Sequence, residues 1–168
     1  MEHTFQQTPP AQPLSAAQRA FIEGCVVIYA ASAGANQQTH LVRSSGCRVE
    51  SDGSVTVFVN AAQAGGLLAD VRANGALATV FCEPGTERAL QLKANDAQTV
   101  AMTNADHHLL SDYHERIVAH IAPVGFAPEM LRNFFAAPRS DAVALRFTPY
   151  AVFDQTPGPN AGAQVPTA

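Results

Sequence analysis

The chain has 168 residues, of which 47% are hydrophobic and 14% charged, and its formal net charge at pH 7 is −4. This length fits one domain with a substantial core and short tails. Because the chain is acidic and contains no block of lysines and arginines, we expect no nucleic-acid partner. No apolar run approaches the roughly 18 residues of a membrane-spanning helix, so we expect no membrane partner either.

The two ends of the chain indicate the limits of the folded domain, and its cysteines indicate the cellular compartment. Residues 1–14 are polar and lack the apolar centre of a secretory signal, which predicts a disordered arm. Cys25, Cys47 and Cys82 are odd in number and form no C-x-x-C pair, which predicts free thiols, a cytoplasmic location and no zinc site. Residues 154–168 are rich in Pro and Gly and are expected to form a surface tail, leaving 15–153 as the domain.

The first elements expected in the domain are a helix over 15–24 and a strand over 25–32. Ser15 and Gln18 have the spacing of a capping box at the helix start. Two further strands are expected over 39–50 and 54–60. The Asp52-Gly53 pair between them is a strong signal for a tight hairpin turn.

A second helix is expected to begin at Asn60, with Gln63 completing a capping box. Gly65 and Gly66 inside this helix cost about 1 kcal/mol each relative to alanine. The close approach of a ligand or a second subunit to the backbone would explain them. The alternative is a weak helix that is merely tolerated.

In the second half of the domain, strands are expected over 76–83, 88–102 and 142–153. The strand over 88–102 is expected to bend near Asn95-Asp96. Leu109, Tyr113, Ile117 and Ile121 recur every four residues, which predicts a long helix that Asn104 caps and that ends at about residue 121. A short helix is expected over 128–136. Strands in hairpin order, without regular crossover helices, predict a mainly β fold: a six-stranded antiparallel barrel with flanking helices.

Motifs for metal and hydrolase chemistry are missing from the sequence. His107 and His114 on the long helix are two turns, or about 10.5 Å, apart, which is too far for one ion. No H-E-x-x-H and no G-x-S-x-G motif occurs, so we expect no metal and no serine hydrolase. His40, on the strand that leads to Arg43, either lines a ligand cleft or is an ordinary strand histidine.

The main candidates for a ligand-binding site are Arg43 and Arg48, with Ser44, Ser45 and Gly46 between them. A guanidinium pairs with two phosphate oxygens at once, and hydroxyls with a glycine suit an anionic ligand. Side chains five residues apart on a regular strand point to opposite faces. Both arginines reach one ligand only if the strand bulges at Ser45-Gly46. Otherwise they are solvated surface charges.

Over about residues 15–153 the chain resembles the pyridoxamine 5'-phosphate oxidase-like proteins, the FMN-binding split barrels. The resemblance lies in the order of SAAQRAFIEG, LVRSSGCRVESDGSVTVFVN, VRANGALATVF and ERALQLKAND, and the closing QTPGPNAG is similar to tails of an uncharacterised bacterial branch. It implies a homodimeric FMN-binding split barrel with its ligand cleft between the subunits. It also implies a flavin-dependent oxidoreductase that acts on an unknown small molecule.

The resemblance implies where FMN would lie, and it identifies no catalytic residue. Arg43 and Arg48 match an Arg-x4-Lys pattern with arginine in place of lysine, and Gln91 matches a glutamine that reaches the flavin of the partner subunit. The expected cofactor contacts are Arg43, Ser44, Ser45, Gly46, Cys47, Arg48, Val59, Asn60, Gln63 and Gln91. Residues 61–64 lack the cationic cluster that holds the phosphate in the family. This departure keeps a second hypothesis open: a non-catalytic small-molecule-binding or dimer-scaffold module that has lost tight FMN binding.

Overall fold

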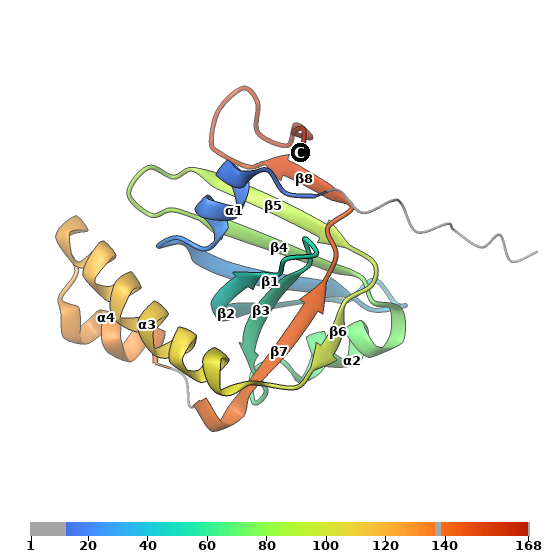
Figure 1. Ribbon diagram of the computed structural model, residues 1–168, viewed down its shortest axis with the longest axis horizontal. Coiled ribbons are helices and arrows are strands. Elements are labelled where there is room, and N and C mark those ends of the chain that lie inside the picture. The colour runs from blue at the N-terminus through green and yellow to red at the C-terminus, as the bar shows by residue number, and fades with distance from the viewer. Residues whose placement is uncertain (1–12, 137–138, 168) are drawn as a thin grey trace, which may run out of the picture.

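The computed structural model describes residues 13–136 and 139–167 of the chain. In this part of the chain, eight strands form one antiparallel sheet that is flanked by four α-helices (Figure 1). The strands are β1 (Val27–Ala33), β2 (Thr39–Val49), β3 (Val55–Asn60), β4 (Leu77–Cys82), β5 (Ala89–Ala94), β6 (Gln98–Val100), β7 (Ala142–Phe147) and β8 (Ala151–Asp154). The helices are α1 (Ala16–Ile22), α2 (Gly65–Asn74), α3 (Asn104–Ile121) and α4 (Pro128–Phe135).

Two short connections close the sheet into a barrel. The strand order is β6-β7-β3-β2-β1-β4-β5-β8, so β7 and β8 would be six strand spacings, or about 29 Å, apart in a flat sheet. Only residues 148–150 connect them, and such a link reaches at most about 14 Å. Residues 95–97 connect β5 to β6 in the same way. The sheet must therefore curl until its two ends approach each other, which confirms the expected antiparallel barrel.

The barrel has eight strands rather than six because two expected strands are each divided. The segment 88–102 breaks near Asn95-Asp96, where a bend was expected, and the segment 142–153 breaks at 148–150. Hydrogen bonds hold the second break: the Thr148 N–H donates to Asp96 Oδ1 at 2.8 Å, and the Tyr150 N–H donates to the Lys93 carbonyl at 2.9 Å. At both breaks the chain passes from one end of the sheet to the other, so the breaks are what permit closure.

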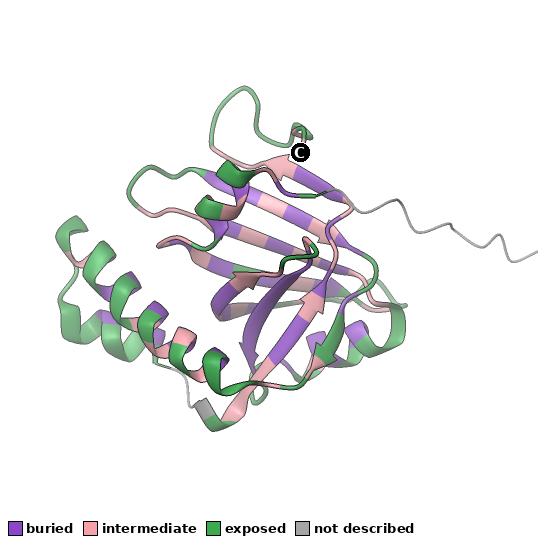
Figure 2. Ribbon diagram, in the orientation of Figure 1, coloured by how far each residue is buried: buried purple, intermediate pink, exposed green. Residues whose placement is uncertain are grey.

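The main hydrophobic core joins residues of the strands to residues of all four helices, and a second, smaller cluster lies beneath α3. Figure 2 shows the buried positions in purple along the strands. β3 is buried along its whole length because it faces both clusters. Val55, Val57 and Val59 belong to the main core, whereas Phe58 packs against Leu110 of α3 in the second cluster. The long helix is thus confirmed, and it covers the face of the sheet that carries the arginines of β2.

Capping boxes fix the starts of two helices. On α1 the expected box is confirmed, since the Ser15 N–H donates to Gln18 Oε1 at 2.8 Å and the Gln18 N–H donates to Ser15 Oγ at 3.3 Å. On α3 the cap is Thr103 rather than the expected Asn104. The Asp106 N–H donates to Thr103 Oγ1 at 3.2 Å, and the Thr103 N–H donates to Asp106 Oδ2 at 2.8 Å. This pair anchors Asp106 near the end of β2.

The residues after β8 fold back onto the barrel. The Val165 N–H donates to the Val152 carbonyl at 2.9 Å, and Gln18 Nε2 of α1 donates to the Pro166 carbonyl at 3.0 Å. These bonds cover the outer edge of β8, which would otherwise expose unpaired backbone groups. Within the described residues, no helix combines the length and the apolar character needed to cross a bilayer.

Candidate functional site

β2 bulges between Ser44 and Cys47, where a bulge was the condition for both arginines to reach one ligand. Ser44 lies opposite Val59 and Cys47 lies opposite Val57, so three steps along β2 match two steps along β3. Ser44 Oγ stabilises the bulge from inside, because it lies 2.8 Å from the Phe58 carbonyl oxygen and accepts the Phe58 N–H at 3.2 Å. The extra residue in the bulge shifts the alternation of side chains between the two faces of β2 by one residue. Arg43 and Arg48 therefore lie on the same outer face.

Arg43 contacts helix α4. Its Nη2 donates a hydrogen bond to the Phe134 carbonyl, and its guanidinium carbon lies 4.3 Å from the centre of the Phe134 ring and 5.0 Å from that of Phe135. These are hydrogen-bond and cation–π contacts to neutral groups. No carboxylate pairs with Arg43 in the described part of the chain.

Arg48 is paired with two carboxylates. Its Nε donates to Asp106 Oδ1 at 2.7 Å, and its Nη1 is paired with Glu50. Asp106 is 1% exposed, and burial on its own would raise its pKa. The Thr103 N–H and the Arg48 guanidinium outweigh burial and hold the pKa of Asp106 below its ordinary value. Arg48 therefore neutralises a buried carboxylate at the start of α3.

Gly46 and Cys47, two further expected contacts on β2, serve packing. A Cβ at Gly46 would come within 3.0 Å of Leu109 Cδ2 and 3.1 Å of Leu110 Cδ2, so Gly46 lets α3 approach the strand. The Cys47 side chain is buried in the core, and burial raises the pKa of its thiol well above the ordinary value. Cys47 is therefore protonated at neutral pH and is unsuited to act as a nucleophile.

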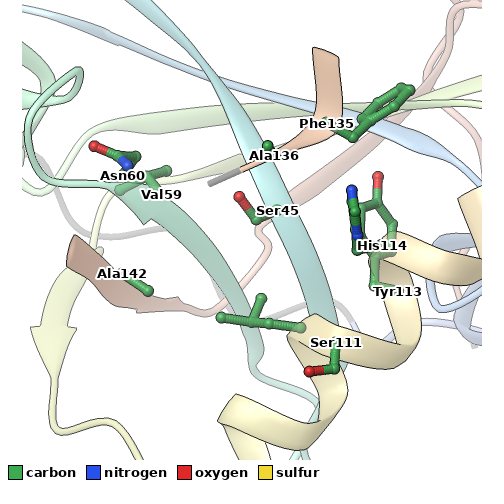
Figure 3. Close-up of a pocket in the computed structure, with 10 residues that line it drawn as sticks. Ser45, Val59, Asn60, Ser111, Tyr113, His114, Phe135, Ala136 and Ala142 are labelled. Carbon is green, nitrogen blue, oxygen red and sulfur yellow. The ribbon is translucent and has the colours of Figure 1, made fainter. Parts of the chain in front are cut away.

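A cavity of about 370 Å³ lies between the bulge of β2, the ends of β3 and β7, helix α3 and the last turn of α4 (Figure 3). Its volume lies within the range of about 300–1,000 Å³ that is typical of small-molecule sites. Three of the expected cofactor contacts, Ser45, Val59 and Asn60, line it together. Tyr113, His114 and Phe135 line the opposite side.

Two polar side chains of α3 at the cavity, Tyr113 and His114, are hydrogen-bonded to backbone carbonyls. The Tyr113 hydroxyl donates to the Val26 carbonyl at 2.7 Å, and burial raises the pKa of Tyr113 above its ordinary value. His114 Nε2 lies 3.1 Å from the Arg132 carbonyl oxygen. Because a carbonyl can only accept, Nε2 carries a proton, and Nδ1 on the other side of the ring lies 3.6 Å from Glu115 Oε1. Neither side chain was expected at the site, since the helical spacing of Tyr113 indicated only a core position.

The passage from β3 to α2 differs from the expected helix start. Asn60 Oδ1 accepts the Ala62 N–H at 2.9 Å, and the Gln63 N–H donates to the Asn60 carbonyl at 3.1 Å, which makes a turn. The helix begins only at Gly65, and its N-cap Ala64 makes no side-chain cap. The predicted Asn60–Gln63 capping box is thus wrong, because the asparagine side chain closes a local turn instead. The Gln63 side chain is exposed.

The glycines of α2 have different surroundings. A Cβ at Gly66 would lie 2.3 Å from His40 Cδ2, whereas a Cβ at Gly65 would meet no atom within 4 Å. His40 Nδ1 lies 2.8 Å from Asp70 Oδ2, which also accepts the Ser32 hydroxyl at 2.7 Å. The close approach to Gly66 therefore comes from a histidine of the same chain. His40 links β2 to α2 and does not line the cavity.

Gln91 lies apart from the other expected contacts. It is on β5, opposite Val80 of β4 and Phe153 of β8, and its Oε1 accepts Gln155 Nε2 at 3.2 Å. β1 and β4 separate β5 from β2 in the sheet. Within one copy of the chain, Gln91 and the cavity therefore do not form one site. In the described residues, no group of three or more His, Cys, Asp or Glu side chains is placed to hold a metal ion.

No protein-family model and no curated protein sequence matches the chain. Solved structures match it in fold. An F420 reductase is 15% identical, covers 80% of this chain and 94% of its own, and has a TM-score of 0.54. HupZ of Group A Streptococcus is 15% identical, with coverages of 89% and 99% and a TM-score of 0.52. A candidate pyridoxamine 5'-phosphate oxidase of Lactobacillus delbrueckii is 13% identical, with coverages of 87% and 98% and a TM-score of 0.52. At these identities the likeness shows the fold. The chain has the split-barrel fold of the pyridoxamine 5'-phosphate oxidase-like proteins, as its sequence predicted.

Proposed function

We propose that the protein binds FMN in the cavity between the β2 bulge and α4, and that it is a flavin-dependent oxidoreductase acting on a small molecule. The observation that supports this most is the meeting of Ser45, Val59 and Asn60 at one cavity. All three are among the residues that the sequence resemblance implies as flavin contacts. When bound, the flavin would supply hydride or electron transfer.

The cavity suits the ring of a flavin. Val59, Leu110 and Phe135 offer apolar surface for a flat aromatic system. Ser45 and Ser111 line the same space, and neither hydroxyl has a hydrogen-bond partner within the described residues. These hydroxyls would orient the polar edge of the ring, and the walls formed by α3 and α4 would limit the access of water.

The phosphate of FMN requires a cation, and the two arginines are not equivalent for this role. Arg48 already neutralises Asp106 and Glu50. Among the described residues, Arg43 is held by a neutral carbonyl and two aromatic rings and by no carboxylate. A phosphate competes well against neutral partners, because a charge-assisted, bidentate pair is stronger than a hydrogen bond to a carbonyl. We therefore assign the phosphate contact to Arg43 alone.

We further propose that two copies of the chain form a dimer with the ligand cleft between them. Exposed apolar side chains support this: Tyr29 and Leu41 on the outer face of β1 and β2, and Met130 and Phe134 on α4. Clusters of such residues mark interaction surfaces. A dimer would also give Gln91 a role, since it can reach the ligand only from a second copy. Free thiols at Cys25, Cys47 and Cys82 are compatible with a reducing cytoplasm.

A second candidate function is a non-catalytic small-molecule-binding or dimer-scaffold module. One observation favours it: residues 61–64 are Ala, Ala, Gln and Ala, so the turn before α2 brings no cation to a phosphate. In that case the fold would remain and tight FMN binding would be lost. Colour separates the two functions, because the FMN-bound protein is yellow and the module stays colourless after soaking in FMN.

A titration of the purified protein with FMN, FAD and pyridoxal phosphate, followed by flavin fluorescence and ligand absorbance, tests the proposal. Ser45→Phe places a large ring in the cavity and should weaken FMN binding by at least tenfold. Ser51→Phe is the matched control, since Ser51 is exposed in the hairpin turn, and it should bind FMN like the unmodified protein. Equal affinity of both variants would show that the ligand binds elsewhere. No binding of FMN by the unmodified protein would favour the module.

A further inference from the structure

The C-terminal turn of α4 is held by side chains from two other elements. The last carbonyls of a helix lack partners within the helix and carry partial negative charge. On α4, Arg43 of β2 donates to the Phe134 carbonyl, and His114 Nε2 of α3 donates to the Arg132 carbonyl at 3.1 Å. Both donors stand beside the cavity, since His114 lines it and Arg43 contacts the ring of Phe135, which also lines it.

The hydrogen bond from Arg43 to the Phe134 carbonyl connects α4 to the sheet. An anion could compete for this guanidinium. α4 packs on α3 through Leu131 and Phe135, and the opposite side of the helix exposes Met130 and Phe134. The helix has only eight residues, too few to be stable without such packing. The guanidinium of Arg43 holds its last turn against β2, and this turn forms one wall of the cavity.

We infer that the last turn of α4 is a movable wall of the cavity, latched by Arg43, and that an anionic group of the ligand opens it by drawing the guanidinium away from the Phe134 carbonyl. The inference builds on the proposed function, because it concerns the same cavity and the same arginine. It adds that one side chain both closes the site and recognises the charge of the ligand. The site then responds to flat ligands that carry a phosphate or carboxylate, and neutral ligands of the same shape leave the wall latched.

Hydrogen exchange of the ligand-free protein tests the latch independently of any ligand. In Arg43→Gln, the amides of α4 should exchange roughly tenfold faster than in the unmodified protein, because a hydrogen bond from a charged donor and two cation–π contacts are lost. Arg72→Gln is the matched control: Arg72 is exposed on α2 and forms no ion pair in the described residues. It should leave α4 unchanged. Equal protection of α4 in both variants would overturn the latch.

Three ligands test the opening by charge. FMN and riboflavin share one ring system, but riboflavin lacks the phosphate, and inorganic phosphate supplies the charge alone. FMN should speed amide hydrogen exchange in α4, and so should inorganic phosphate when it is compared with chloride at equal ionic strength. Bound riboflavin should leave the exchange unchanged. Bound FMN that leaves α4 unchanged or better protected, or riboflavin that loosens it equally, would refute the inference. If FMN does not bind at all, the proposed function fails, and the latch is judged by the Arg43 variant and by phosphate.

Discussion

Replacing Gly66 with alanine should destabilise the protein, although alanine is the better helix former. The new Cβ would lie 2.3 Å from Cδ2, 2.4 Å from Nε2 and 2.7 Å from Cγ of His40. Contact distances between such atoms are about 3.5–4.0 Å, so the ring would have to move by about 1 Å or more. Such a movement would break the contact between His40 Nδ1 and Asp70 Oδ2, which are 2.8 Å apart, and Asp70 is held in turn by buried Ser32 at 2.7 Å.

Two opposing terms set the size of this effect. Alanine gains about 1 kcal/mol over glycine in a helix. Loss of the hydrogen bond to Asp70 costs about 1–3 kcal/mol, and overpacking adds about 1–3 kcal/mol. His40 is partly exposed and can turn outward, which limits the overpacking term. We therefore expect the free energy of unfolding to fall by about 1–2 kcal/mol in Gly66→Ala.

Urea unfolding followed by circular dichroism measures this effect, and the neighbouring glycine provides the control. Gly65→Ala adds the same methyl group where no atom lies within 4 Å, so it should be neutral or stabilising by up to about 1 kcal/mol. In the double variant His40→Ala with Gly66→Ala, the overlap is absent, and the two changes should cost less together than the sum of the single changes. A Gly66→Ala protein as stable as Gly65→Ala would refute the reasoning.

Three further predictions concern buried polar groups. Thr79→Val should raise the free energy of unfolding, measured in urea, by about 1 kcal/mol, because Thr79 Oγ1 is buried without a hydrogen-bond partner in the described structure. Thr56→Val is the control and should lower the free energy of unfolding, because the Thr56 hydroxyl donates to Glu50. Arg48→Gln should lower the free energy of unfolding by about 1–2 kcal/mol, because it removes the 27%-exposed guanidinium that neutralises buried Asp106. FMN affinity, measured by fluorescence, should stay the same. The lowered pKa of Asp106 means that the folded state binds its proton less tightly than the unfolded state, so stability is present above about pH 4 and falls as the pH drops below it. Asp106→Asn should flatten this acid dependence in thermal unfolding curves recorded between pH 2 and 6, and an unchanged curve would contradict the assignment.

The order of the elements could be predicted from the sequence because local signals and tertiary structure agree there. The Asp52-Gly53 turn, the four-residue spacing on α3 and the box of Ser15 with Gln18 all specify their elements within a few residues. The number of strands could not be predicted. The segments 88–102 and 142–153 have continuous strand character, and each is divided only because the chain has to cross between the ends of a closed sheet. Closure is a property of the whole sheet, so no local pattern reports it.

The candidate site could be predicted from β2 and β3 but not from the helices. The spacing of the arginines required a bulge if both were to share a face, and the bulge is present between Ser44 and Cys47. The wall formed by α3 and α4 gave no such signal, because Tyr113 and Phe135 follow the same apolar pattern as core residues. Gly66 is a similar case, since its neighbour His40 is distant in sequence and only the fold brings the two together.

The bulge brings two arginines to one face, and their neighbours then give them different roles. Arg48 meets the carboxylates of Asp106 and Glu50, so displacing it would leave a buried negative charge unpaired, which is costly. Arg43 meets a carbonyl and aromatic rings, so displacing it leaves only neutral groups and a solvent-accessible helix end. An incoming phosphate can therefore recruit Arg43 at small cost and cannot recruit Arg48. In the proposed latch, Arg43 of β2 is therefore the cation that would take the place of the cationic cluster missing from residues 61–64, and α4 would hold it until the ligand arrives.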